Sequence, residues 1–174
     1  MAKGDTFFLR TKLATSTTSY VSDEIDISAF TNPSEGRILV VDRSFITFGT
    51  VGNGPIGAAN VVSSSTGSKG MGVQVCSETQ TGLVEMPDTS LISKVIYYAA
   101  VNPAAALSMV QELSALNPSD YVSGMIVPTD KIHCGAQTGS AWNTELDIGF
   151  LFEVHTEKLS LRRIQELLIS LTAN

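Results

Sequence analysis

The feature that most limits the fold of this chain is the alternation of apolar and polar side chains from Glu145 to His155. The apolar set is Leu146, Ile148, Phe150, Phe152 and Val154, and the positions between them are Glu145, Asp147, Gly149, Leu151, Glu153 and His155. Successive side chains of a strand point to opposite faces of a sheet. The period of two therefore predicts a strand with one face in a core and one mainly polar face.

Seven further runs are rich in β-branched and aromatic residues, as strands are. With Glu145 to His155, the predicted strands are Thr6–Leu13, Tyr20–Ile27, Arg37–Phe48, Gly72–Cys76, Ser93–Ala99, Tyr121–Val127 and Lys131–Cys134. Proline-containing turns punctuate them, and no strand-helix-strand alternation is visible. We expect an all-β fold, an antiparallel β-sandwich.

The end of the chain predicts an amphipathic helix. Ser160 is a suitable N-cap, and the charged and amide side chains from Arg162 to Glu166 fall opposite one apolar stripe. The stripe consists of Leu161, Ile164, Leu167, Leu168 and Leu171. Because so short a helix is marginal alone, the stripe must dock on something. We expect these five residues to form an assembly interface with a neighbouring subunit.

Two other segments carry weaker signals. Asn102-Pro103 resembles a helix start, which predicts a helix over Ala104–Leu116. The segment Gly49–Gly70 is rich in Gly, Ser, Ala and Asn, which indicates a long surface loop or a pair of weak edge strands.

Composition indicates one folded domain over residues 1–174, with 159–174 as the C-terminal helix and tail. The chain has 43% hydrophobic and 16% charged residues, enough apolar material for a core. A net charge of -6 and scattered basic residues argue against direct nucleic-acid binding. Since no signal-peptide core or apolar run long enough for a membrane span is visible, we expect synthesis in the cytosol and no transmembrane segment.

The two cysteines, Cys76 and Cys134, have no CxxC spacing and are too few for a disulfide framework. Buried free thiols are the favoured interpretation, ahead of a disulfide or a reactive thiol.

Two glycine-containing motifs resemble phosphate-binding sequences without their context. Gly52-x-Gly54-x-x-Gly57 precedes Glu78 at the spacing of a dinucleotide fingerprint, but Pro55 interrupts it and no helix follows. Ser68-Lys69-Gly70 lacks the full phosphate-loop frame. Both are interpreted as loop, and no cofactor is expected.

The titratable residues do not form a recognisable catalytic set. His133 and Cys134 are adjacent and so point to opposite faces of a strand, whereas Glu153 and His155 share one face that we expect to be exposed. The acids Asp23, Glu24, Asp26, Glu145, Asp147 and Glu153 are likewise expected on solvated faces. We therefore expect no enzyme and no metal site, although a sandwich enzyme with scattered catalytic residues stays open.

Three aromatic residues are candidates for a sugar-stacking platform. These are Trp142, Tyr97 and Tyr98. For Trp142, an anchor that holds a loop to the core is the favoured alternative.

Several stretches together resemble the small single jelly-roll capsid proteins of tailless icosahedral viruses. Val21–Phe30 followed by Arg37–Phe48 resembles the opening strands of those proteins, and Tyr121–His133 a penultimate strand pair. The passage from Glu145–His155 into the helix at Ser160–Leu171 is similar to their last strand and terminal helix.

The resemblance implies an eight-stranded jelly roll that self-assembles into a shell, made in the host cytoplasm and located in the virion. Its partners would be copies of itself and, in some members, a second capsid or membrane-associated virion protein. The alternative is a ligand- or carbohydrate-binding sandwich, such as a virion spike or decoration protein.

Overall fold

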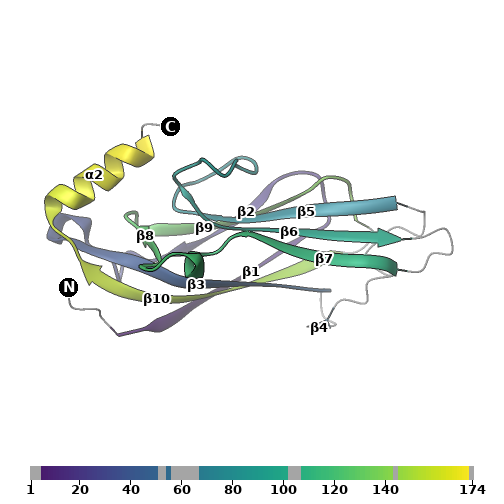
Figure 1. Cartoon of the computed structure of the whole chain (residues 1–174), viewed down its shortest axis with the longest axis horizontal. Coiled ribbons are helices and arrows are strands. Elements are labelled where there is room, and N and C mark those ends of the chain that lie inside the picture. The colour runs from purple at the N-terminus through teal and green to yellow at the C-terminus, as the bar shows by residue number, and fades with distance from the viewer. Residues whose placement is uncertain (1–4, 51–53, 56–66, 102–106, 143–144, 173–174) are drawn as a thin grey trace.

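The computed structural model describes residues 5–50, 54–55, 67–101, 107–142 and 145–172, and these residues form two antiparallel sheets packed face to face (Figure 1). Sheet A contains β1 (Phe7–Thr15), β10 (Leu146–Lys158), β3 (Arg37–Thr50), β4 (Gly54–Pro55) and β8 (Met125–Val127). Sheet B contains β2 (Val21–Asp26), β9 (Lys131–Thr138), β5 (Gly67–Cys76), β6 (Leu91–Val101) and β7 (Leu107–Leu116).

The order of the strands is that of a jelly roll. Apart from the short β4 and the edge strand β7, sheet A pairs as β1-β10-β3-β8 and sheet B as β2-β9-β5-β6. The chain crosses between the sheets after β1, β2, β4, β7, β8 and β9, so sequence neighbours seldom pair. The antiparallel sandwich and its eight-stranded jelly-roll core are confirmed.

Strand β10 has the alternation that the sequence predicts. It pairs with β1 on one side and with β3 on the other, from Leu146 to Lys158. Its apolar residues from Leu146 to Val154 are buried, and the residues between them up to Glu153 are half-buried. The period of two has therefore fixed which face of β10 enters the core.

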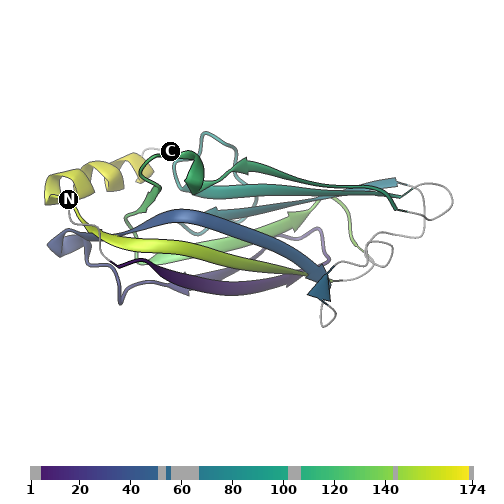
Figure 2. The same ribbon diagram turned by 60° about the horizontal axis from the view of Figure 1, so that its bottom comes forward.

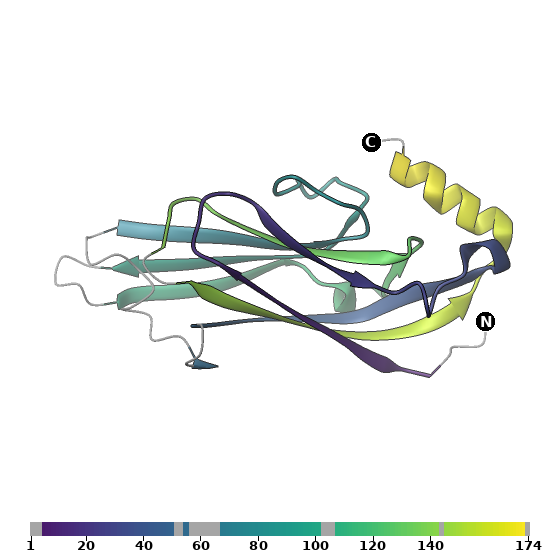
Figure 3. The same ribbon diagram turned by 180° about the vertical axis from the view of Figure 1, so that it is seen from behind.

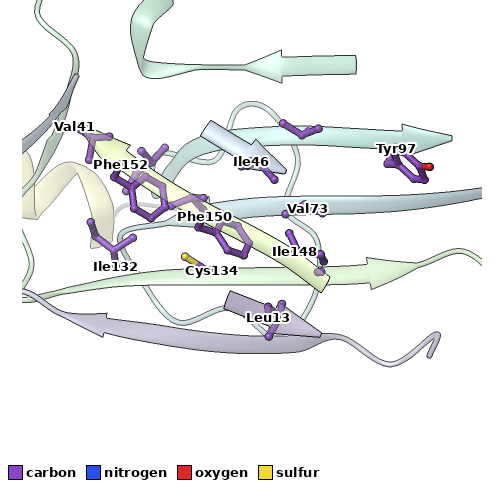
Figure 4. Packing of buried hydrophobic residues seen from close by; sticks show 14 of the residues in the cluster. Leu13, Val41, Ile46, Val73, Tyr97, Ile132, Cys134, Ile148, Phe150 and Phe152 are labelled. Carbon is purple, nitrogen blue, oxygen red and sulfur yellow. The ribbon is translucent and has the colours of Figure 1, made fainter. Parts of the chain in front are cut away.

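The main core lies between the two sheets (Figure 4). Phe150 and Phe152 of β10 face Val73 of β5 and Cys134 of β9, and all four are buried. At one end of this core, the Tyr97 ring stacks on Phe48 with 4.7 Å between ring centroids. Both cysteines are buried free thiols, as predicted.

The prediction of a helix over Ala104–Leu116 is wrong. Residues 107–116 form β7, which pairs antiparallel with β6, while 102–106 lie outside the described residues. Pairing with the open edge of sheet B has overridden a weak local helix signal. The segment Gly49–Gly70, predicted to be a long loop or a pair of weak edge strands, is strand where the structure describes it, in the end of β3, in β4 and in the first residues of β5.

The predicted strand Tyr121–Val127 is shorter than expected. A 3-10 turn, η2 (Pro118–Asp120), precedes it, and only Met125–Val127 pairs with β3. Gly124, with φ of 64°, ends the turn and lies too close to the Val41 carbonyl to admit a side chain.

The C-terminal helix α2 (Leu161–Thr172) begins as predicted after Ser160, whose Oγ accepts a hydrogen bond from the Arg163 amide at 3.3 Å. It lies at one end of the sandwich (Figures 1 and 3). Its buried residue Ile164 packs on Ile38 and Val40 of β3, with Ile126 and Leu159 beside them. Of the helices within the described ranges, none is long and apolar enough to cross a membrane.

Candidate functional site

The apolar stripe of α2 is only partly covered by the chain itself. Ile164 is 2% exposed and Leu167 is half-buried, whereas Leu161 is 54% and Leu168 37% exposed. Leu161 and Leu168 are seven residues apart and so lie on the same side of the helix. The side chain of Leu171 is outside the described residues. Of the predicted interface residues, Ile164 and Leu167 are thus at least half-buried, whereas Leu161 and Leu168 are exposed.

Ile169 extends the open edge of the stripe, and the sequence interpretation missed it. Its side chain is exposed, and it lies eight residues after Leu161, on the flank of the same side of the helix. We call Leu161, Leu168 and Ile169 the helix ridge. An aliphatic ridge of this kind on a charged helix is a surface that a partner could cover.

The polar border of α2 carries its own ion pairs. Glu166 accepts from Arg162 Nε at 3.2 Å and from Arg163 at 3.4 Å. All three side chains are well exposed, so each pair contributes only about 0.3–0.5 kcal/mol. These pairs support the helix but do not cover the ridge.

A second uncovered apolar surface lies on the outer face of sheet A, where α2 covers only the end of β3 around Ile38 and Val40 (Figure 2). Phe8 of β1 is 55% exposed, Phe45 of β3 is 45% exposed, and Leu151 of β10 is half-buried between them. We call these three residues the sheet patch. Phe45 and Leu151 are direct cross-strand partners, and Phe8 is diagonal to Leu151.

The sheet patch borders a hollow and a charged rim. The hollow, of about 320 Å³, lies beside Gly149 and Thr47, whose hydroxyl occupies the space next to Gly149, and is flanked by Arg10, Phe45 and Leu151. Two ion pairs stand at the rim, Lys12 with Asp147 at 3.1 Å and Arg43 with Glu153 at 3.7 Å. The only sequence signal for this patch was Leu151 on the predicted polar face of the strand from Glu145 to His155.

His155 is not on an exposed polar face, and that expectation is wrong. Its side chain is buried, with Nδ1 2.7 Å from Asp42 and Nε2 3.1 Å from Glu157. His155 pairs with Val40, so it lies on the side of sheet A where α2 docks. A bulge at Glu153/Val154 leaves Asp42 as the extra residue of β3, beside the imidazole.

The other titratable candidates do not converge on a reaction centre. The Cys76 thiol has its pKa raised by burial to about 12, and burial also raises the pKa of Cys134, so the thiolate needed for nucleophilic attack is disfavoured. Lys131 pairs with Glu24 at 2.7 Å, and Thr11 donates to Asp23 at 2.7 Å. Over the described part of the chain, no three His, Cys, Asp or Glu side chains are arranged to hold a metal ion.

The two glycine motifs are not phosphate sites where the structure describes them. Gly52 and Gly57 lie outside the described residues, and Gly54 is in the short strand β4. Lys69 is in β5 and donates to the carbonyl of Ala141.

The aromatic candidates separate into two buried residues and one exposed residue. Trp142 is buried with its ring 5.7 Å from that of Tyr97, and its amide donates to Ser16, so it anchors its loop as favoured from sequence. Tyr97 is also buried, and neither ring is a sugar platform. Tyr98 is exposed and lies across Gly70, where an added Cβ would be 3.0 Å from its ring.

Tyr98 stands at the edge of a hollow on the outer face of sheet B. The hollow has a volume of about 650 Å³, and Gly70 and Gly72 form part of its floor. Leu83, Lys94 and Gln137 line its sides. Because Gln74 donates to the Gly82 carbonyl and accepts from the Val84 amide, the loop that carries Leu83 is tied to the sheet.

Comparison of sequences finds no match to any protein-family model or to any curated protein. Comparison of structures does find similar chains, and they are viral capsid proteins. VP1 of Trichodysplasia spinulosa-associated polyomavirus, solved with sialylated glycooligomers, has a TM-score of 0.51 and 9% identity over 87% of this chain and 95% of that one. This likeness agrees with the jelly-roll topology.

Two further structures overlap at lower TM-scores. The unassembled pentamer of Merkel cell polyomavirus VP1 gives 0.42, with 6% identity over 87% of this chain and 96% of that one. A chain of turnip yellow mosaic virus gives 0.36, with 9% identity over 90% of this chain and 94% of that one.

Proposed function

We propose that this protein is a structural capsid subunit that self-assembles with copies of itself into a shell. The observation that carries the proposal is the helix ridge, an aliphatic surface left open on α2 by a chain with a capsid-type jelly roll. The proposal assigns the chain no catalytic step and no cofactor.

The ridge supports assembly because α2 is held to its own domain by little more than one side of the helix. A helix of twelve residues is marginal in water without tertiary contacts. Ile164 supplies the contact with β3, while Leu161 and Leu168, which neighbour it on the same face of the helix, stay exposed. A neighbouring subunit that covers Leu168 would bury apolar area and further stabilise the helix.

The fold alone does not decide this function, since jelly rolls also serve as lectin and enzyme domains. The proposal therefore depends on the uncovered side chains. Phe8 and Phe45 contribute further exposed aromatic area, and aromatic residues are enriched in protein interfaces. In this role the protein would be a virion component made in the host cytoplasm. Other capsid or membrane-associated virion proteins are further candidate partners.

The expected role does not include direct binding of the genome. The chain carries 11 basic and 17 acidic residues, so it lacks the excess positive charge with which coat arms neutralise phosphates. In the particle, another component would bind the genome.

The test is the oligomeric state of the purified chain. Light scattering coupled to size-exclusion chromatography, with negative-stain electron microscopy of the same fractions, should reveal closed oligomers or shells. A protein that stays monomeric at all concentrations, and that is also absent from its native particle, would refute the proposal.

A second candidate function is favoured by the hollow beneath Tyr98. Its volume of about 650 Å³ is in the range of small-molecule sites, and it combines an exposed ring, aliphatic walls and the ammonium of Lys94. This supports a ligand-binding sandwich such as a spike or decoration protein. Glycan-array binding that is lost in Tyr98→Ala would favour this function, and it would also be compatible with a coat role.

A further inference from the structure

A loop stands over the outer face of sheet B and leaves part of that face open. The loop, residues 77–90 between β5 and β6, lies on the side of sheet B that faces away from sheet A (Figures 1 and 3). Gln74 fixes the loop, because its buried side chain donates to the Gly82 carbonyl at 2.8 Å and accepts from the Val84 amide at 2.8 Å. The loop therefore holds Leu83 against Gly72 of β5.

The hollow of about 650 Å³ beside this loop, which we call the sheet B hollow, has an aromatic ring at its edge. Tyr98 of β6 is the direct cross-strand partner of Gly70, and its ring lies across that glycine. The side chain is 38% exposed, so a ring supported by the sheet stays accessible from the hollow. Tyrosine offers a flat apolar body together with a polar tip, which suits the stacking of a sugar ring.

The floor of the hollow cannot accept a peptide as an added strand. Strand β5 is paired on both sides, with β6 at Gly70 and with β9 at Gly72. The backbone groups of the floor are therefore used by the two ladders, whereas strand addition needs an open sheet edge. A ligand in the hollow must be recognised by side chains.

The polar side chains at the hollow suit hydroxyl groups. Tyr98 and Thr18 each carry a hydroxyl, which both donates and accepts. Among the described residues, the side chain of Gln137 makes one hydrogen bond, from Nε2 to the Thr18 carbonyl at 3.1 Å, so its amide oxygen is left as an acceptor. Sugar hydroxyls also donate and accept, and Leu83 and Ile96 add apolar walls for the ring.

The charge of the hollow favours an acidic ligand. Of the described residues that line it, Lys94 is the one charged side chain, in a chain with 17 acidic and 11 basic residues. Its ammonium donates to the Val84 carbonyl and has no acidic partner within ion-pair distance in the described ranges. An ammonium has three donors, so two remain for a ligand carboxylate, and such charge-assisted hydrogen bonds are about twice as strong as neutral ones.

We propose that the sheet B hollow binds a sugar ring that carries a carboxylate, as the terminal residue of an acidic glycan. This inference rests on the second candidate function and names its ligand class. Tyr98 and Leu83 contact the apolar faces of the sugar, and Thr18 and Gln137 bind its hydroxyls. The ammonium of Lys94 binds the carboxylate.

Two soluble probes that differ at one group test the ligand class. Methyl glucuronide has the carboxylate, and methyl glucoside has a hydroxymethyl group in its place. In ligand-observed NMR titrations, the unaltered chain should bind the glucuronide at least about tenfold more tightly, as expected for a hydrogen bond to a charged group. Lys94→Gln should lower the affinity for the glucuronide to that for the glucoside, because the amide keeps a donor but has no charge.

Variants of the aromatic ring test the stacking. Tyr98→Ala should abolish binding of both sugars. Because Tyr98 packs on Gly70, a thermal melt accompanies each variant, and Tyr98→Phe keeps the ring if Tyr98→Ala does not fold. Tyr98→Phe should weaken both sugars and preserve the ratio of their affinities.

Two controls alter the same residue types outside the hollow. Lys131→Gln removes a cation of β9 that pairs with Glu24 at 2.7 Å, and Tyr121→Ala removes another exposed tyrosine. Both controls should bind the two sugars like the unaltered chain.

The possible results separate this inference from the functions on which it builds. It is overturned if neither sugar binds, if both bind equally, or if the preference for the glucuronide survives in Lys94→Gln. Acetyl-glutamate amide that binds as tightly as the glucuronide would also overturn it, since the hollow would then recognise charge without a sugar ring. Light scattering of the same samples reports assembly: shells without sugar binding overturn only this inference, whereas a glucuronide-binding chain that never assembles refutes only the coat function.

Discussion

The imidazole of His155 lies 2.7 Å through Nδ1 from the carboxylate of Asp42, and its other nitrogen lies 3.1 Å from Glu157. Each ring nitrogen thus has a carboxylate oxygen within hydrogen-bond distance. The two carboxylates are about a quarter exposed or less, and the ring is buried. This buried polar cluster joins β3 to β10 on the side of sheet A where α2 docks.

Replacing His155 by glutamine should therefore destabilise the domain. An amide donates from one end only, so glutamine keeps at most one of the two carboxylate contacts of His155, and the loss of the other costs about 1–3 kcal/mol. Urea unfolding followed by circular dichroism measures the change. The matched control is His133→Gln, at the other buried histidine, whose nearest polar partner is the Thr79 hydroxyl at 3.4 Å. Equal losses of unfolding free energy in the two variants would show that the contacts of His155 with the carboxylates do not stabilise the domain.

The buried thiols should make the protein less stable in alkali. An unfolded cysteine has a pKa of about 8.5, whereas burial raises the pKa of Cys76 to about 12 and also raises that of Cys134. Above pH 8.5 the unfolded chain loses thiol protons that the native chain keeps, so the free energy of unfolding falls as pH rises towards 12. Below about pH 8.5 the thiols stay protonated in both states, so they do not lower the free energy of unfolding there.

Urea unfolding at pH 8 and pH 10.5 tests this dependence. The double variant Cys76→Ala with Cys134→Ala should lose less stability between the two pH values than the unaltered chain. In the native protein at pH 8, neither thiol should react with a disulfide reagent, and both should react in urea. Rapid labelling of the native protein would contradict the burial of the thiols.

Gly36 should not tolerate a side chain. Its φ is 87°, and an added Cβ would stand 2.4 Å from the carbonyl oxygen of Leu159. Its own carbonyl accepts the Leu159 amide at 2.8 Å, so it holds the turn between β10 and α2. Gly36→Ala should cost at least about 1–3 kcal/mol, from backbone strain alone. Thermal melts beside Gly82→Ala, where an added Cβ meets nothing within 4 Å, provide the control.

The sequence predicted the elements that depend on local periodicity. The alternation around Phe150 identified β10, and the 3.6-residue stripe around Ile164 identified α2. It did not predict β7, because a strand at a sheet edge is decided by the neighbour with which it pairs.

The candidate site was only partly predicted, because the exposure of its side chains depends on packing between elements as well as on periodicity. Periodicity places Leu161 and Ile164 on one stripe, but only the packing of the helix on Val40 shows which of them stays open. The outward position of Phe45 depends on the register of β3 with β10. The burial of His155 depends on a bulge and on the helix above it.

The last prediction separates the two edges of the α2 stripe. Ile164 is 2% exposed and packs on Ile38 and Val40, so Ile164→Asp buries an unpaired charge and should collapse the melting transition. Leu168 is 37% exposed, so Leu168→Asp leaves the charge in water in the isolated subunit. It should unfold at nearly the unaltered temperature, within about 0.5 kcal/mol in stability, yet fail to assemble.

Size-exclusion chromatography beside a thermal melt distinguishes these outcomes, because one reports assembly and the other reports folding. Met86→Asp, at an exposed apolar residue of the 77–90 loop rather than on the helix, is the control and should change neither. If Leu168→Asp assembles like the unaltered chain, the ridge has no role between subunits. If its melting transition collapses as in Ile164→Asp, the ridge instead packs within its own subunit, because only a residue buried in the monomer can unfold it when charged.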